Sequence, residues 1–222
     1  KISEYKPLKV EIFSCGDELI KAGKTLRKGH LYDSNREMLI NFIKKLGFIV
    51  EDLGILKDNI NSINDKINNA SKNNDLIITS GGMSLGEEDH IKKLIEKNGK
   101  MYAWRLAIKP GRPVGFGQYK NCSILGLPGN PAAAFVTFLL IGIPILKTMS
   151  GELIHKYNLI PITSDFTHKK KKGRKEFIRV NLINKDNKLL LKKFPREGAG
   201  ILSSTAWASG LAIMDENIEN IK

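Results

Sequence analysis

The sequence contains little cysteine and little tryptophan, with two residues of each among 222. Cys15 and Cys122 lie in separate apolar segments, and the cysteine and histidine spacings match neither a zinc site nor a disulfide framework. The histidines are scattered along the chain: His30, His90, His155 and His168. These features favour a reducing compartment, and we expect the protein to be cytoplasmic.

The sequence also lacks a long uninterrupted apolar run. The longest, 135–146, is broken by Gly142 and Pro144, so we predict a buried helix there and no membrane as a partner. The first residues lack the basic and apolar regions of a secretory signal. They do not begin with methionine and open directly into a strand pattern, so we expect a piece of a longer protein.

Aromatic residues are few, at 7%, although the net charge is +13. A nucleic-acid-binding module would interleave its basic residues with aromatic side chains or carry a recognition motif, and neither is found, so we expect no nucleic acid as a partner. The densest basic segment, HKKKKGRK at 168–175, fits a solvated loop better than an anion-binding surface, but both interpretations stay open.

Up to residue 150 the sequence alternates between strand and helix patterns. We expect strands at 8–14, 48–56, 75–80, 102–108, 114–117 and 122–127, and helices at 32–47, 61–72, 88–99 and 131–149. This order predicts an α/β domain whose mostly parallel sheet carries helices on both faces. Such sheets bind ligands beyond the carboxyl ends of their strands.

After Gly151 the pattern changes to short alternating strands with turn residues between them. We therefore predict two domains, an α/β domain at 1–150 and a small β domain at 151–222. At the helix starts, Ser34 and Glu37 have the spacing of a capping box, and Asn130 before Pro131 has the pattern of an N-cap.

The stretch LIITSGGMSLGEEDH at 76–90 joins a buried strand to two glycines and three acids. Glycines after a parallel strand allow a ligand to approach the backbone, and a following helix favours an anion. A structural interpretation competes, because Ser84 and Glu87 also have capping-box spacing and acids are common in a first helical turn. The stretch matches neither the dinucleotide fingerprint nor the P-loop.

Two further loops gather polar groups at predicted strand ends. RLAIKPGRP, at 105–113, places Arg105, Lys109 and Arg112 around one turn, which suits a phosphate or another oxyanion, although an ordinary basic turn explains it equally well. LPGNP, at 127–131, starts a helix at a strand end. The residues alone therefore predict an oxyanion-binding crevice with carboxylates able to hold Mg²⁺.

These segments, in this order, carry a resemblance to a known family. GDEL (16–19), YDSNR (32–36), SGGMSLGEED (80–89), LAIKPGRP (106–113), LPGNP (127–131), GRKEFIR (173–179) and EGAGILSS (197–204) resemble the molybdopterin molybdotransferases, which include the gephyrin E domain. The resemblance covers essentially the whole chain. It implies a molybdopterin-binding α/β domain followed by the family's small C-terminal β domain.

The resemblance also implies an activity, in which adenylated molybdopterin and molybdate react with Mg²⁺ assistance and AMP is released. Asp58 and Asp89 match catalytic acids that would hold the metal. Lys109 matches an essential lysine, Arg105 stands beside it in the motif, and Arg179 matches an arginine at the molybdate site. The implied pterin-binding residues are Asp33, Ser80, Gly81, Gly82, Ser84, Gly86, Glu87, Pro128, Gly129 and Asn130.

The sequence departs from the family pattern at a few positions. Arg105 replaces a lysine, Cys15 replaces a threonine, and Ala199 stands where a hydroxyl residue is common, so we leave Ala199 out of the site and keep Ser203 as a weak candidate. Family members carry two further N-terminal domains, and a partner protomer usually completes their site. We therefore expect a homodimer of the full-length protein, with molybdopterin adenylyltransferase as a candidate partner. The resemblance also implies that this piece alone lacks part of the active site needed for turnover.

Two alternatives remain beside the enzyme. A molybdopterin-binding scaffold without catalysis would tolerate the changes at Cys15 and Ala199. A nucleotide hydrolase of the competence-damage type shares the α/β domain, but the predicted β domain and the FIR segment at 177–179 argue against it.

Overall fold

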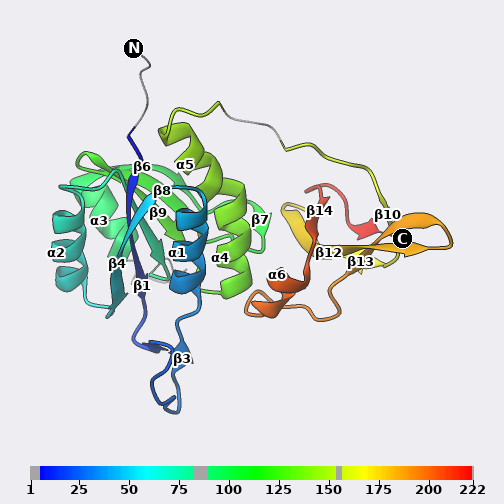
Figure 1. Cartoon of the computed structure of the whole chain (residues 1–222), viewed down its shortest axis with the longest axis horizontal. Coiled ribbons are helices and arrows are strands. Elements are labelled where there is room, and N and C mark those ends of the chain that lie inside the picture. Colours follow the sequence, from blue (N-terminus) through cyan, green and yellow to red (C-terminus); the bar gives the residue numbers. More distant parts are fainter. Residues whose placement is uncertain (1–5, 83–89, 154–156, 222) are drawn as a thin grey trace.

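The computed structural model describes residues 6–82, 90–153 and 157–221, which form two parts joined by the segment after α5 (Figure 1). In the first part, the described residues form a six-stranded sheet of order β4-β1-β5-β9-β8-β6. Its strands are β1 (Lys9–Cys15), β4 (Ile49–Leu56), β5 (Leu76–Ser80), β6 (Gly99–Trp104), β8 (Gly115–Tyr119) and β9 (Cys122–Leu127).

The direction of the strands places several loops at one edge of this sheet. β4, β1, β5 and β9 pair in parallel, whereas β8 runs antiparallel to both β9 and β6. β6 therefore points the same way as the parallel strands, and the loops that follow β1, β4, β5, β6 and β9 all leave from the same edge. The predicted mostly parallel α/β sheet is confirmed.

Helices cover both faces of the sheet because side chains along each strand alternate between them. In β1, Phe13 and Cys15 pack in one core cluster with α2 (Ile60–Ala70) and α3 (His90–Asn98). Val10 and Ile12 pack in the other, against α1 (Asn35–Lys45) and the helical segment after β9. Each fully buried side chain of this size contributes about 1.5–3 kcal/mol to folding.

The apolar segment after β9 is one helical rod with an irregular centre. It consists of α4 (Pro131–Thr137), a π-helical turn η1 (Phe138–Gly142) and α5 (Ile143–Met149). By length and composition alone Pro131–Met149 could cross a membrane. Its buried residues Phe138 and Leu146 pack in the core cluster with side chains of the sheet, as expected of a core helix.

The second part is a β domain, as predicted. Its sheet has the order β10-β13-β12-β14, formed by β10 (Thr163–Ser164), β12 (Lys175–Lys185), β13 (Lys188–Lys193) and β14 (Gly210–Met214). A short strand from the first part, β7 (Ile108–Lys109), also pairs with β12. β11 (His168–Lys169) pairs with β15 (Asn220–Ile221), and α6 (Ser203–Trp207) lies beside the sheet.

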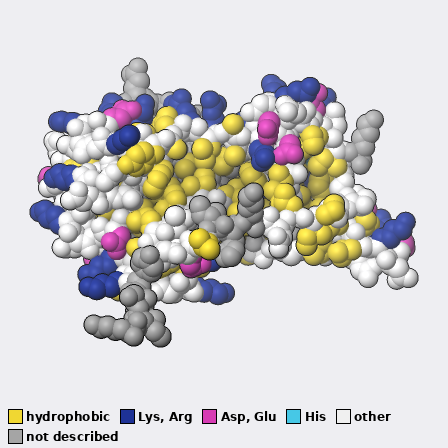
Figure 2. Space-filling model, turned by 90° about the horizontal axis from the view of Figure 1, so that it is seen from above, with side chains coloured by type: hydrophobic (Ala, Val, Ile, Leu, Met, Phe, Trp, Pro, Cys, Tyr) yellow, Lys and Arg dark blue, Asp and Glu magenta, His cyan; other side chains and the backbone are white. Residues whose placement is uncertain are grey.

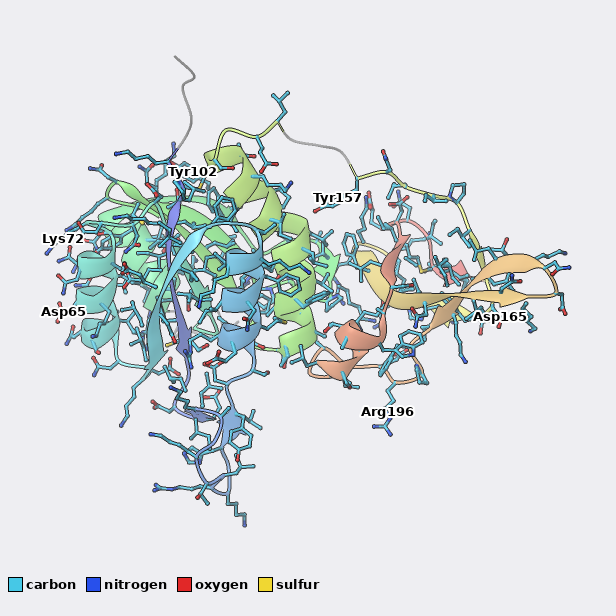
Figure 3. All side chains as sticks on the ribbon, in the orientation of Figure 1. Asp65, Lys72, Tyr102, Tyr157, Asp165 and Arg196 are labelled. Carbon is cyan, nitrogen blue, oxygen red and sulfur yellow. The ribbon has the colours of Figure 1, made fainter. Side chains whose placement is uncertain are left out.

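Two projecting segments complete the described chain. β2 (Leu19–Ile20) and β3 (Leu31–Tyr32) form an arm that extends from the carboxyl edge of the large sheet (Figure 1). The connection from α5 to β10 exposes Leu153, Leu159 and Ile160. In Figure 2, hydrophobic side chains gather along the middle of the face seen from above, with basic side chains toward its ends. The same connection carries Tyr157, whose hydroxyl donates to the carbonyl of Leu139 at 2.6 Å (Figure 3).

The predicted elements differ from the structure mainly at their ends. The strand expected at 102–108 is divided, because Arg105 adopts a φ of 58° and turns the chain between β6 and β7. Within the described part of the chain, neither Ser34 nor Asn130 caps its helix through the side chain, so the predicted capping box at Ser34 is wrong. Asn59 instead caps α2, accepting from the N–H groups of Asn61 and Ser62.

Candidate functional site

A cavity of about 760 Å³, here called the edge cavity, opens at the carboxyl edge of the large sheet. The loops after β1, β4, β5 and β9 line it through Cys15, Asp58, Gly81 and Pro128. Successive parallel strands bring these loops together although they are far apart in the sequence. The predicted positions Asp33, Ser80, Gly82, Gly129 and Asn130 also line this cavity.

Gly81 shows why glycine follows β5. Its φ is +85°, and a Cβ atom built there would lie 2.3 Å from the carbonyl oxygen of Cys15. The close packing of β5 against the end of β1 therefore requires glycine, whatever the cavity binds. This gives a structural reason for a glycine that the sequence alone attributed to ligand approach.

Asp58 lies in the loop after β4 and reaches the end of β1. The Cys15 thiol donates a hydrogen bond to Asp58 Oδ1, with the sulfur 2.9 Å from the oxygen. Burial, together with this bond and the negative charge of Asp58, raises the pKa of the Cys15 thiol well above its usual range. The thiol thus stays protonated and serves as the donor that a threonine hydroxyl would provide at this position.

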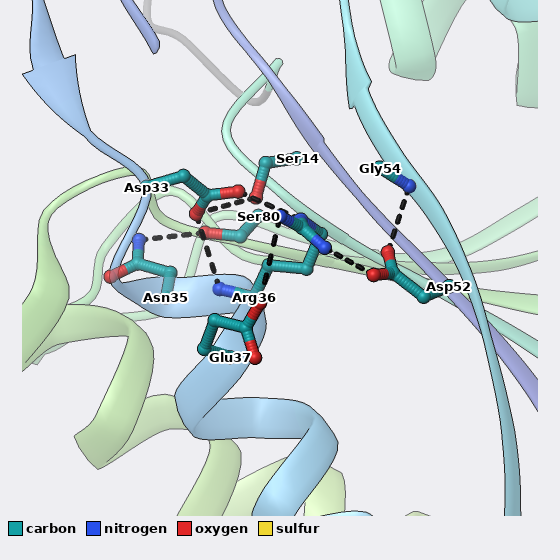
Figure 4. Close-up of polar contacts among 8 residues, drawn as sticks. All are labelled: Ser14, Asp33, Asn35, Arg36, Glu37, Asp52, Gly54 and Ser80. Carbon is teal, nitrogen blue, oxygen red and sulfur yellow. Dashed lines mark hydrogen bonds and ion pairs between the residues drawn. The ribbon is translucent and has the colours of Figure 1, made fainter. Parts of the chain in front are cut away.

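Asp33 lines the edge cavity, but its carboxylate is already engaged (Figure 4). It accepts from the Ser14 hydroxyl at 3.0 Å and from Arg36 Nε at 2.9 Å, and Arg36 also pairs with Asp52. Burial lowers the pKa of Arg36, but the hydrogen bonds that Arg36 donates to Asp52 and Asp33 outweigh burial and raise the pKa overall. This buried network fixes the start of α1 beside the cavity.

Asn35, the first residue of α1, joins two of the predicted positions. Its amide nitrogen donates to Ser80 Oγ and to the carbonyl of Gly129, both at 2.7 Å. Because the carbonyl can only accept, the amide orientation is fixed and Oδ1 points the other way. Among the described residues this buried Oδ1 has no hydrogen-bond partner, so it is an acceptor available to a ligand N–H group.

A second cavity, of about 290 Å³, lies between the two parts of the chain and is here called the inter-domain cavity. Lys109 and Arg112 line it from the α/β domain, and Arg179 lines it from the β domain. The two cavities share Pro113, Pro128 and Asn130 as lining residues, so they adjoin.

Lys109 reaches this cavity because β7 pairs with β12, which sets Lys109 beside Glu176. Its ammonium nitrogen lies 3.0 Å from Glu176 Oε1. The Lys109 side chain is 46% exposed while that of Glu176 is 8% exposed. The buried carboxylate of Glu176 therefore pairs with a lysine that is itself partly exposed and lines the inter-domain cavity.

Arg179 lies on β12 and is half-buried at the cavity wall. One of its terminal nitrogens donates to the carbonyl of Gly198 at 3.1 Å, whereas its buried Nε has no hydrogen-bond partner in the described chain. Burial lowers the pKa of Arg179, partly offset by the charges of Glu176 and Glu197. A guanidinium remains charged at neutral pH, so an unpaired buried donor here favours an oxyanion ligand.

The lysine run at 168–175 is mostly structural. Lys170 is buried and donates to the carbonyls of Arg174 and Glu216, and Lys175 pairs with Asp215. From this segment, His168 and Arg174 line the inter-domain cavity. The segment is therefore neither a fully solvated loop nor a single anion-binding surface, because its side chains are divided between structural contacts and the cavity.

The remaining predicted positions divide into two groups. Ser84, Gly86, Glu87 and Asp89 lie outside the residues that the structure describes. Arg105 is exposed, its guanidinium lies 5.8 Å from the Trp104 ring centroid, and it lines neither cavity as the described residues outline them. Lys109 and Arg112 therefore meet at one cavity without Arg105.

The proposed Mg²⁺ site can be tested only at Asp58. Asp58 lines the edge cavity and its Oδ1 accepts one thiol hydrogen bond, which leaves oxygen lone pairs for a hard cation. Among the described residues, no group of three His, Cys, Asp or Glu side chains could hold a metal ion. These residues alone therefore do not make up a magnesium site, and we assign no step to the ion.

The site contains residues that the sequence did not single out. Asn35 lies in the YDSNR segment, and Glu176 lies in GRKEFIR, so the motifs contained them without indicating a role. His168 lies in the basic segment 168–175, which indicated no role for the histidine itself, and Lys193 lies in no such segment. The packing of β11 and β13 brings both to the inter-domain cavity.

Comparisons with known proteins agree with this geometry. Residues 11–148 match the model of a probable molybdopterin binding domain, and residues 162–222 match that of the MoeA C-terminal region, domain IV. The chain is 35% identical over 98% of its length to a molybdopterin molybdenumtransferase of Haemophilus influenzae, covering 54% of that protein. It is 33% identical over 82% of its length to the molybdenum cofactor synthesis protein cinnamon of Drosophila melanogaster, covering 30% of it.

The fold has a solved counterpart. A molybdopterin biosynthesis moea protein from Pyrococcus horikosii superposes with a TM-score of 0.80 at 27% identity, covering 97% of this chain and 52% of that one. The chain thus spans about half the length of these counterparts, and the family resemblance carried by its motifs is confirmed. The chain belongs to the family of molybdopterin-binding domains, and it carries the MoeA-type C-terminal region after that domain.

Proposed function

We propose that this chain forms the catalytic portion of a molybdopterin molybdotransferase, in which molybdate is inserted into adenylated molybdopterin and AMP is released. The observation that carries the proposal is that Lys109 and Arg179 line one cavity beside the glycine-lined edge cavity, and that the buried Nε of Arg179 has no hydrogen-bond partner among the residues the structure describes. The printed names of the relatives support a transferase in molybdenum cofactor synthesis.

Each cavity suits one part of such a reaction. The edge cavity, at about 760 Å³, has room for a pterin, and Asn35 Oδ1 offers an acceptor for a ring N–H. The inter-domain cavity is smaller and lined by cations, so it suits a compact dianion such as molybdate. Because the cavities adjoin, a molecule bound in the first has its phosphoanhydride within reach of cations from the second.

Lys109 and Arg179 then have distinct roles. Cleavage of a phosphoanhydride spreads negative charge over the phosphate oxygens, and Lys109, exposed at the cavity, can neutralise part of it. Arg179, fixed by its bond to Gly198, holds molybdate and positions it toward the pterin sulfurs. When bound, Mg²⁺ would add charge neutralisation through Asp58, and the contribution of Asp89 stays a prediction.

Three further features of the proposal come from the family resemblance. A homodimer of the full-length protein, an association with molybdopterin adenylyltransferase and a cytoplasmic location all stay predictions. Size-exclusion chromatography with light scattering tests the first of them, because a homodimer would have twice the mass of one full-length chain.

Replacement of Lys109 tests the proposal. In the full-length protein, we expect Lys109→Ala to lower molybdate-dependent AMP release by about a hundredfold or more, because a charge that stabilises the transition state is lost. The control is Lys188→Ala, which removes an exposed lysine at the start of β13 and should leave AMP release unchanged. Equal rates for Lys109→Ala and the wild type, with both proteins folded, would contradict the role of Lys109.

The second candidate function is a molybdopterin-binding scaffold. The Cys15 thiol donates a hydrogen bond to Asp58, as a hydroxyl group could, which weakens one of the arguments for lost catalysis. A wild-type full-length protein that binds the pterin but releases no AMP in the presence of molybdate and Mg²⁺ would favour the scaffold.

A further inference from the structure

Four polar side chains, one from each of the strands β13, β11, β12 and β7, lie in a row that ends at Lys109. Lys193 Nζ lies 3.2 Å from His168 Nδ1, His168 Nε2 lies 3.2 Å from Glu176 Oε1, and the same oxygen lies 3.0 Å from Lys109 Nζ. His168 and Glu176 are buried, with 8% and 6% of their surface exposed. A buried polar chain of this kind stabilises one arrangement of its members.

The chemistry of the donors fixes the direction of the chain. An ammonium group has only donors, so His168 Nδ1 accepts from Lys193 and the ring proton lies on Nε2. This nitrogen faces Glu176 Oε1, although the contact is not aligned well enough to count as a hydrogen bond. Glu176 Oε1 is thus approached by donors from both sides, His168 behind it and Lys109 toward the cavity.

The local charges argue against Glu176 as a ligand of the anion. Its second oxygen, Oε2, is buried and has no hydrogen-bond partner among the residues described, so the carboxylate is held inside the wall of the cavity. Glu197 is the other acid that lines this cavity, and its hydrogen bond to Lys193 lowers the pKa of its carboxyl. Glu176 therefore pairs with Lys109 and Glu197 pairs with Lys193, so the Arg179 guanidinium remains for the ligand.

From this arrangement we infer that Glu176, supported by His168, is a positioning residue that holds the Lys109 ammonium at the inter-domain cavity for an incoming oxyanion. The strand pairing alone fixes only the backbone of Lys109, because its long side chain would otherwise sample many rotamers. This inference rests on the proposed function, because in that function the incoming oxyanion is molybdate.

The first arm of the test examines the position of Lys109 without any ligand. The full-length protein is acylated with a limiting amount of acetic anhydride, and the modification of Lys109 relative to Lys188 is followed by mass spectrometry. We expect Glu176→Gln and His168→Ala to increase the relative rate at Lys109 about threefold or more, because an ion-paired ammonium reacts slowly. An unchanged rate in both variants would overturn the inference.

The second arm measures molybdate binding by calorimetry in the wild type, Glu176→Gln, Lys109→Ala and the double variant. We expect Glu176→Gln to weaken binding about tenfold in the wild-type background and less than twofold when Lys109 is already alanine. Asp215→Asn, which removes the exposed ion pair to Lys175 in the same domain, serves as the matched control and should leave binding unchanged.

Each result of the second arm decides between roles. Equal weakening in both backgrounds would show that Glu176 acts independently of Lys109, and tighter binding by Glu176→Gln would show that the carboxylate competes with the anion, so either would overturn the inference. A wild-type protein that binds no molybdate would contradict the proposed function instead. In that case the acylation arm still decides whether Glu176 holds Lys109.

Discussion

At the scale of single residues, the two cavity cations differ in how their charges are balanced. Lys109 is paired with the buried carboxylate of Glu176, whereas the buried Nε of Arg179 has no partner within the described residues. Burial lowers the pKa of Arg179, because removing the charged guanidinium from water disfavours its charged form. An oxyanion bound there would offset this cost, so Arg179 marks the side of the cavity where the ligand is expected.

The two buried thiols give a prediction for the dependence of stability on pH. Burial raises the pKa of Cys122 to about 12 and that of Cys15 further, whereas the pKa of a cysteine thiol in the unfolded chain is about 8.5. Above that value the unfolded chain loses thiol protons that the folded chain keeps. The free energy of unfolding should therefore fall with rising pH, by up to about 1.4 kcal/mol per pH unit for each thiol, between pH 9 and about 12.

Urea unfolding at a series of pH values measures this slope. The double variant Cys15→Ser and Cys122→Ser keeps small donors at both positions but removes the ionisation, so its slope over the same pH range should be shallower. A slope identical to that of the wild type would contradict the assignment to the thiols.

At the scale of helices and strands, hydrophobic period predicted most elements, because buried faces repeat regularly along the chain. The features that it missed depend on single residues or on tertiary contacts. The positive φ of Arg105 ends β6 before the predicted strand is complete, and the two-residue strands β7, β11 and β15 are too short to produce a periodic pattern. The π-helical turn at Phe138–Gly142 likewise lies within the apolar segment 135–146, whose composition does not distinguish it from the α-helices on either side.

The capping of α2 provides a prediction at this scale. Asn59 Oδ1 accepts from the N–H groups of Asn61 and Ser62, at 3.1 and 3.0 Å. We expect Asn59→Ala to lower the free energy of unfolding by about 1 kcal/mol, because these N–H groups lose their acceptor. Chemical denaturation monitored by circular dichroism measures the change.

Ser34→Ala provides the matched control for the helix cap. Ser34 occupies the same position before α1 but makes no side-chain cap in the described structure, so its replacement should change stability by less than about 0.5 kcal/mol. If the Ser34 variant lost as much stability as the Asn59 variant, the assignment of the cap would be wrong.

At the scale of the whole molecule, the candidate site depends on how the β domain sits against the α/β domain. The pairing of β7 with β12 and the hydrogen bond from Ala132 N–H to the Ala199 carbonyl, at 2.8 Å, join the two parts. Ala199, set aside because it lacks a hydroxyl, thus contributes through its backbone. The motifs predicted Lys109 and Arg179 separately, but no local pattern indicates that both line one cavity.

This arrangement also explains why His168 and Lys193 could not be predicted. Their places depend on the pairing of β11 with β15 and of β13 with β12, which brings distant segments of the β domain to the cavity. By contrast, the residues of the edge cavity follow parallel strands in sequence order. The rule that ligands bind beyond the carboxyl ends of parallel strands was therefore sufficient to predict that the loops after these strands lie together.

The central claim is that Lys109 and Arg179 face one oxyanion site between the domains. Crystals of the full-length protein grown with molybdate, with diffraction recorded near the molybdenum absorption edge, test it directly. We expect an anomalous molybdenum peak in the inter-domain cavity, between the Lys109 ammonium and Arg179 Nε. Molybdenum bound only elsewhere on the protein, with this cavity free of anomalous density, would contradict it.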